Sequence, residues 1–183
     1  MGMKLHKTVV LVGMMGAGKT AVGKELARML SVPFRDSDEE IVTASRMTIA
    51  EIFARDGEEF FRAREAEVIA RLLRDTPSVL SVGGGAFLNG ETRALITELG
   101  VSVWLKADLD LLWARVRHKT TRPLLRTDNP RQTLSDLLDA RAPVYALADL
   151  VVEARVSYAI PDMARAVMAE LLTRPDVLEG QKT

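Results

Sequence analysis

The strongest chemical signal in this sequence is a glycine-rich run near the N-terminus. The run Gly13-Met14-Met15-Gly16-Ala17-Gly18-Lys19-Thr20 fits G-x-x-x-x-G-K-[ST], the phosphate-binding P-loop pattern. An apolar β-branched stretch at 8–12 precedes it and a helical pattern at 21–30 follows, which is the context that favours a P-loop over an ordinary glycine turn. Backbone N–H groups there can surround an anion, with Lys19 at the β- and γ-phosphates and the Thr20 hydroxyl on Mg²⁺.

The acidic residues that could bind this Mg²⁺ follow the second predicted strand and not the third, where the Walker B acid would lie. Residues 79–83, at the end of the third predicted strand, contain no acid for the Walker B position, whereas Asp36 and Asp38 follow the second strand at 32–35. Because Mg²⁺ takes few protein ligands, we expect Thr20 and one of these acids at the metal and the other acid at a substrate hydroxyl. Capping of the next helix is an alternative role for either acid.

Two further stretches point to the same face of the sheet. Gly83, Gly84 and Gly85 follow a buried strand, and three glycines in a row favour backbone contact with a ligand over a simple turn. From Arg115 to Arg131 the chain has six Arg or Lys residues and one acid. Beside a P-loop this predicts a lid that closes over ATP, with a solvated charge run or a nucleic-acid patch as alternatives.

Alternating strand and helix patterns must position these residues. Strands are predicted near 8–12, 32–35, 78–82, 101–105 and 150–152, with helices between them. This alternation predicts a parallel sheet covered on both faces, with ligands at the carboxyl ends of the strands. We expect a single domain over residues 1–183, with the lid at about 115–131 and a frayed tail at about 173–183.

Composition excludes several classes of protein. The 183 residues include 25 Lys+Arg and 25 Asp+Glu, and this zero net charge argues against a bulk nucleic-acid binder. The chain has no cysteine, which excludes disulfides, thiolate metal sites and a Cys nucleophile. It shows no signal-peptide apolar core and no apolar run of about 20 residues. We therefore expect a cytoplasmic monomer with neither a membrane nor a nucleic-acid partner.

Several stretches, taken together and in order over roughly residues 8–161, resemble the shikimate kinase family. They are the P-loop, Asp36-Ser37-Asp38, Gly57-Glu-Glu-Phe-Phe-Arg62-x-x-Glu65, Gly83-Gly84-Gly85, Arg122-Pro-Leu-Leu and Arg141-Ala-Pro-Val-Tyr145. Each stretch alone is weak, but the combination is specific. The resemblance implies an α/β, three-layer α/β/α P-loop kinase fold, with a five-stranded parallel sheet in the order 2-3-1-4-5 and a lid loop.

The resemblance also implies an activity and a set of site residues. The activity is ATP-dependent phosphorylation of the shikimate 3-hydroxyl, giving shikimate 3-phosphate and ADP for chorismate and aromatic amino acid biosynthesis, with ATP and Mg²⁺ bound. The implied catalytic residues are Lys19, Asp38 and Arg122, and the metal positions are Thr20 and Asp36. The implied shikimate positions are Asp38, Arg62, Gly83, Gly84, Gly85, Arg141, Phe53, Phe61 and Pro123. The implied ATP positions are Gly13, Met14, Met15, Gly16, Ala17, Gly18, Lys19, Thr20, Ala21, Arg115, Arg122 and Pro161.

Two rival functions follow from the same P-loop. The first is another small-metabolite kinase, such as gluconate kinase. Arg62, Arg141 and Gly83-Gly84-Gly85 together argue against it, and guanidinium groups suit a planar carboxylate. The second is a nucleotide-binding regulatory module without transfer activity, which predicts the loss of catalytic positions. The sequence keeps all four of these positions, Lys19, Asp36, Asp38 and Arg122.

Overall fold

The central feature of the fold is a five-stranded parallel sheet, seen in a computed structural model that describes residues 2–119 and 125–180. Its order is β3-β4-β2-β5-β6, which confirms the predicted order 2-3-1-4-5. The strands are β2 (Thr8–Val12), β3 (Phe34–Asp36), β4 (Val79–Ser81), β5 (Gly100–Lys106) and β6 (Leu150–Glu153). β3 begins two residues later than predicted, and Pro33 before it has no N–H to donate to a neighbouring strand.

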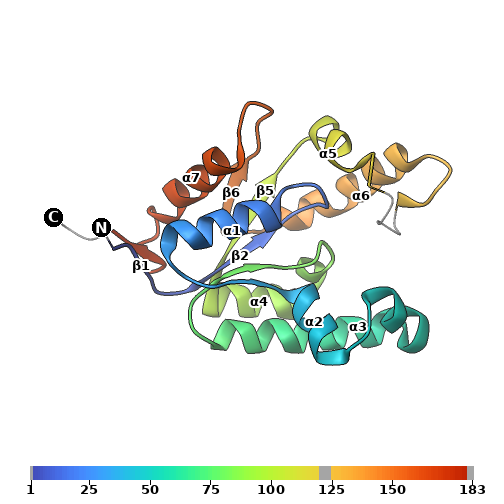
Figure 1. The fold of residues 1–183 in the computed structure, drawn as a ribbon, viewed down its shortest axis with the longest axis horizontal. Coiled ribbons are helices and arrows are strands. Elements are labelled where there is room, and N and C mark those ends of the chain that lie inside the picture. The colour runs from blue at the N-terminus through green and yellow to red at the C-terminus, as the bar shows by residue number, and fades with distance from the viewer. Residues whose placement is uncertain (1, 120–124, 181–183) are drawn as a thin grey trace.

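Helices cover both faces of this sheet. They are α1 (Lys19–Leu30), α2 (Ser37–Ser45), α3 (Ile49–Arg74), α4 (Gly90–Leu99), α5 (Leu109–Val116), α6 (Pro130–Tyr145) and α7 (Ile160–Leu171), with a short 3₁₀ helix η1 (Ala86–Leu88). Figure 1 shows α1 and α7 on one side of the sheet and α3 and α4 on the other, which confirms the three-layer prediction. Within the described ranges, none of these helices is both long and apolar enough to cross a membrane.

The central strand holds the P-loop in place. All residues of β2 are buried, and Val9, Val10 and Leu11 have 0% of their surface exposed. A continuous apolar run suits a strand that is covered by helices on both faces. Because β2 pairs with β4 on one side and β5 on the other, the loop that follows it starts from the most constrained part of the core.

The predicted lid segment is partly helical. α5 continues to Val116 and α6 begins at Pro130, with the Asn129 side chain accepting a hydrogen bond from the Gln132 N–H as its N-cap. Residues 120–124, which include the predicted site residues Arg122 and Pro123, lie outside the described residues. The lid role of this segment therefore stays a prediction.

The prediction of a frayed tail is wrong for the residues up to 180. β7 (Leu178–Glu179) pairs antiparallel with β1 (Lys4–Leu5), and Figure 1 shows this ribbon at the end of the molecule where both termini lie. Val177 and Leu178 are buried, which gives the pairing its apolar contacts. A two-residue strand is too short to show a period, so the sequence pattern does not predict it.

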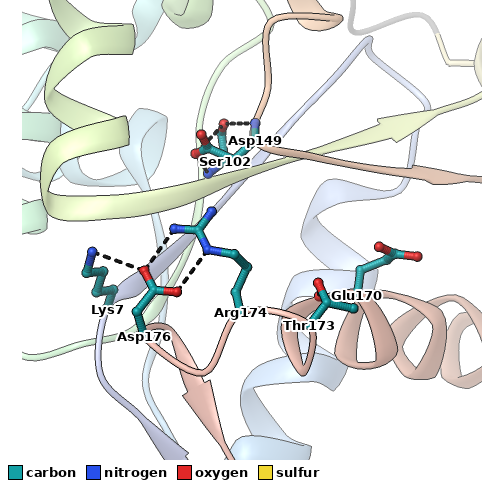
Figure 2. A network of polar contacts seen from close by, with 7 residues as sticks. All are labelled: Lys7, Ser102, Asp149, Glu170, Thr173, Arg174 and Asp176. Carbon is teal, nitrogen blue, oxygen red and sulfur yellow. Dashed lines mark hydrogen bonds and ion pairs between the residues drawn. The ribbon is translucent and has the colours of Figure 1, made fainter.

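Polar contacts fasten the same tail to the body of the domain. In Figure 2 the side chains of Lys7 and Arg174 both reach Asp176. Arg174 donates two hydrogen bonds of 2.8 Å to the two carboxylate oxygens, and Lys7 Nζ lies 3.4 Å from one of them. The hydrogen bond from Arg174 holds the pKa of Asp176 well below its usual range. The charged carboxylate thus joins the N- and C-terminal segments.

This tail makes a testable contribution to stability. Leu178→Ala is expected to lower the free energy of unfolding by about 2–4 kcal/mol, because it removes a buried side chain from the core. The matched control is Glu179→Gln on the neighbouring exposed residue, where a change within about 0.5 kcal/mol is expected. Urea unfolding measures both variants. If neither Leu178→Ala nor Glu179→Gln changes the free energy of unfolding, the prediction of a frayed tail is supported.

Candidate active site

A cavity of about 1370 Å³ collects most of the predicted site residues. One set of lining residues comes from the P-loop and the region around 154–163, and another comes from α2, α3 and the glycines at 83–85. These segments follow β2, β3, β4 and β6, so the cavity forms where parallel strands end, as predicted. It joins a phosphate-binding loop to a second, differently built subsite.

The P-loop has the backbone shape that its glycines predict. Gly16 and Gly18 have φ values of +82° and +93°, and Gly18 is the N-cap of α1. Residues 14–21 line the cavity. Lys19 Nζ donates to the carbonyl oxygen of Gly13, so the lysine lies against its own loop. The loop therefore offers backbone N–H groups, a helix N-terminus and a cation at one place.

Of the two predicted adenine contacts, Arg115 lines the cavity and Pro161 does not. Arg115, on α5, lines the cavity and donates a 2.9 Å hydrogen bond to the Gly16 carbonyl. Pro161 is at the start of α7, and its neighbours Ala159 and Ile160 line the cavity instead. Tyr158 also lines the cavity, and no motif in its loop predicts that position.

The two predicted metal ligands both line the cavity. Asp36 is the N-cap of α2, since its Oδ1 accepts hydrogen bonds from the N–H groups of Asp38 (2.9 Å) and Glu39 (3.2 Å). The alternative capping role is thus confirmed for Asp36. The cap uses only Oδ1, and within the described ranges Oδ2 takes no hydrogen bond. Together with the Thr20 hydroxyl, it forms a set of hard oxygen donors that fits Mg²⁺.

The three consecutive glycines make room for charged side chains. A Cβ on Gly83 would lie 3.2 Å from Asp38 Oδ1, and one on Gly84 would lie 2.8 Å from Arg141 Nη1. None of the three has a positive φ, so the constraint at these positions is the space taken by the neighbouring charged side chains. The charged side chains gathered around them are Asp38, Arg62, Glu65 and Arg141. We name these four residues and Gly83–Gly85 the charged cradle.

Substitution of the third glycine should disturb the cradle selectively. A Cβ on Gly85 would lie 2.7 Å from Arg62 Cζ, so Gly85→Ala must displace the guanidinium. We expect the KM of an anionic acceptor to rise about tenfold or more, with little change in the KM of ATP. Gly90→Ala is the matched control, because its nearest contact is an ordinary 3.5 Å from Arg93. Steady-state kinetics with both substrates varied measure these KM values. Equal acceptor KM values in Gly85→Ala and Gly90→Ala would refute the prediction.

Arg62 is held by a buried carboxylate. Its Nη1 lies 2.8 Å from Glu65 Oε1, and only 4% of the Glu65 side chain is exposed. The other oxygen, Oε2, is buried without a hydrogen-bond partner and faces Gly83. The sequence shows the i,i+3 spacing of this pair, which is typical of exposed helix-face pairs, but it does not show the burial of Glu65 against Gly83.

Burial raises the pKa of both acids of the charged cradle, Asp38 and Glu65. Burial raises the pKa of Asp38, and the neighbouring charge of Asp36 raises it further, while Lys19 and Arg62 act in the opposite sense. Burial also raises the pKa of Glu65, against the hydrogen bond from Arg62. A carboxylate with a raised pKa is a stronger proton acceptor, and it lies beside the P-loop lysine.

Two phenylalanines form the apolar wall of the cradle. The rings of Phe53 and Phe61 have centroids 4.8 Å apart, and both residues line the cavity. In a straight helix, residues eight positions apart are separated by about 12 Å along the axis. α3 instead bends at Gly57, whose φ is +86°. The bend therefore lets the two rings meet.

The fold and the cavity together define a P-loop kinase, with a phosphate loop facing a subsite that contains two arginines. Residues 15–173 match the sequence profile described as shikimate kinase. A shikimate kinase from Cereibacter sphaeroides is 67% identical over 176 residues, covering 96% of this chain and 88% of that protein. The chain therefore belongs to the shikimate kinase family, whose activity is shikimate phosphorylation in chorismate biosynthesis.

Solved structures agree with this assignment. A shikimate kinase from Acinetobacter baumannii in complex with shikimate superposes with a TM-score of 0.85 at 38% identity, covering 91% of this chain and 93% of that one. A gluconokinase from Sinorhizobium meliloti shows a TM-score of 0.60 at 20% identity, covering 93% and 94% of the two chains. At that identity the second similarity concerns the fold alone, so it does not support the gluconate alternative.

Proposed function

We propose that the charged cradle binds shikimate beside ATP, and that the protein transfers the γ-phosphoryl group to the 3-hydroxyl. The observation that carries this proposal is the convergence of two arginines and two carboxylates on Gly83–Gly85, next to a P-loop. Guanidinium groups recognise a carboxylate, and carboxylates accept hydrogen bonds from ring hydroxyls. Arg62 and Arg141 would hold the acid, while Asp38 would hold the reacting hydroxyl.

The chemical step then follows from the residues around the hydroxyl. The hydroxyl oxygen attacks the γ-phosphorus in line, the bond to the β-phosphate oxygen breaks, and ADP leaves. Asp38 orients the hydroxyl and takes its proton. The proton moves late in the reaction, because the attacking hydroxyl forms little bond to phosphorus in a loose transition state. Lys19 stabilises the negative charge on the transferring group. Arg122, outside the described residues, is proposed to do the same from the lid.

The metal and the remaining contacts complete the proposal. Thr20 and Asp36 would hold Mg²⁺, which neutralises phosphate charge when it is bound. Phe53, Phe61 and Pro123 would form the apolar part of the shikimate site. Arg115 would contact the adenine, and the role of Pro161 opposite it stays a prediction. A monomeric state and a cytoplasmic location also stay predictions.

The proposal is tested by the acceptor dependence of ADP release. With ATP and Mg²⁺ present, shikimate should stimulate ADP release strongly, whereas gluconate at the same concentration should not. Faster release with gluconate would favour the rival kinase. Binding of ATP without stimulation by either acid would favour a regulatory module.

A further inference from the structure

Tyr145 is a buried residue that the proposed reaction does not use. None of its surface is exposed, and its ring packs against Trp104 with centroids 5.9 Å apart. A phenylalanine would fill the same space without a polar atom. Burial of a hydroxyl is unfavourable unless the group is hydrogen-bonded, so the position of its oxygen is informative.

The hydroxyl of Tyr145 contacts the backbone of the charged cradle. It donates a 2.6 Å hydrogen bond to the carbonyl oxygen of Gly84, across 61 residues of sequence. Since a peptide group is planar and trans, fixing this carbonyl also fixes the N–H of Gly85, which points the opposite way. In the described parts of the chain, no protein acceptor takes the N–H groups of Gly84 and Gly85. Both glycines line the cavity, so these N–H groups are available to an acceptor substrate.

The same hydroxyl lies beside an arginine of the cradle. Arg141 precedes Tyr145 by one helical turn on α6, so both side chains share a face of the helix. A Cβ on Gly84 would lie 2.8 Å from Arg141 Nη1 and 3.4 Å from the Tyr145 oxygen. Burial raises the pKa of Tyr145, while the charge and hydrogen bonding of Arg141 oppose that rise. The hydroxyl thus remains protonated and able to donate at neutral pH.

The other side of the same glycine faces the phosphate loop. The Gly84 Cβ position is 3.7 Å from the carbonyl oxygen of Gly13, which is the oxygen that Lys19 contacts. Gly84 therefore lies between the arginine that would hold the acid and the first residue of the P-loop. A shift of this peptide would move the acceptor subsite relative to the phosphates.

We propose that Tyr145 is a positioning residue for the acceptor: its hydroxyl fixes the Gly84–Gly85 peptide and the Arg141 guanidinium in the arrangement that binds the substrate carboxylate. This inference rests on the proposed function. Tyr145 does not line the cavity, so we expect it to act on acceptor binding through Gly84 and Arg141.

The test is Tyr145→Phe, which removes one oxygen and keeps the ring packed on Trp104. We expect the KM of shikimate to rise about tenfold, while kcat and the KM of ATP change by less than about twofold. The matched control is Thr8→Val, which removes another buried hydroxyl, one that accepts a 3.2 Å hydrogen bond from Ser78 N at the far end of β2. Both variants should melt at a lower temperature, but the control should keep the wild-type KM values.

The possible results separate positioning from a merely structural role. A lower melting temperature with an unchanged shikimate KM would overturn the inference, and so would equal increases in the KM values of both substrates. If the wild-type protein itself releases no ADP in response to shikimate, the proposed function and this inference fall together. An active wild type with an unaffected Tyr145→Phe variant overturns the inference alone.

Discussion

Asp38→Asn is expected to retain ATP binding and to lose most turnover, with kcat reduced by about 10²- to 10⁴-fold. Asparagine has nearly the same shape but cannot accept the hydroxyl proton. The carboxylate lies against Gly83, and the charges of Lys19 and Arg62 act on it, so it is placed between the two subsites. Single-turnover phosphoryl transfer and ATP titration measure the two properties separately.

A neighbouring acid on the same helix provides the control. Glu39 is exposed, so Glu39→Gln should leave kcat close to that of the wild type. Near-normal turnover by Asp38→Asn would remove the proposed base. A loss of ATP affinity as large as the loss of kcat would instead mean that Asp38 contributes to nucleotide binding.

The raised pKa of Asp38 also has a signature in pH dependence. Because the ionised carboxylate is the active form, kcat/KM for shikimate should fall as the pH drops through the pKa of Asp38. Burial raises that pKa above the ordinary value of 3.8, so the decline should begin at a higher pH than for an exposed aspartate. Glu65 interacts with Asp38, and the profile therefore reports the pair. A flat profile down to the ordinary aspartate range would contradict this.

Arg62→Ala is expected to weaken shikimate binding by about 10²-fold or more, with little effect on the Kd of ATP. The substitution removes a proposed ligand of the carboxylate and also leaves the buried Glu65 without its ion pair. Truncation of one member of a buried charge pair typically costs about 2–5 kcal/mol. Calorimetric titration with shikimate, in the presence of a non-hydrolysable ATP analogue, measures the effect.

The control for this variant lies two residues further along α3. Arg64 pairs with Glu67 at 2.9 Å, and half of its side chain is exposed. Exposed pairs contribute about 0–1 kcal/mol, so Arg64→Ala should change neither affinity. An unchanged shikimate Kd in Arg62→Ala would defeat the assignment of the carboxylate site. Arg62→Lys separates charge from the planar guanidinium, and it should rescue binding only in part.

The parts of the site that the sequence predicted are those encoded locally. The P-loop is a continuous motif, because consecutive backbone groups surround the phosphate, and its strand and helix can be read on either side of it. Asp36 and Asp38 were found because a strand end fixes which edge of the sheet they occupy. The arginines and the strand order came from the resemblance to a family, and not from spacing.

The parts that sequence reasoning missed depend on contacts between distant segments. Glu65 resembles an ordinary partner of a helix-face arginine until its burial against Gly83 is seen. The Tyr145 hydroxyl donates a hydrogen bond to a carbonyl 61 residues away in sequence, and no local sequence pattern predicts that contact. The C-terminal strand was missed for a related reason: Leu5 pairs with Leu178, close to the opposite end of the chain.

The central claim is that the phosphoryl group of ATP reaches the 3-hydroxyl of shikimate. The direct measurement is the identity of the product, from ³¹P and proton NMR of a reaction that contains the protein, ATP, Mg²⁺ and shikimate. We expect one phosphorylated product per ADP formed, with the phosphate coupled to the proton on carbon 3. ADP formed together with inorganic phosphate alone, or a phosphate on another oxygen of shikimate, would contradict the account.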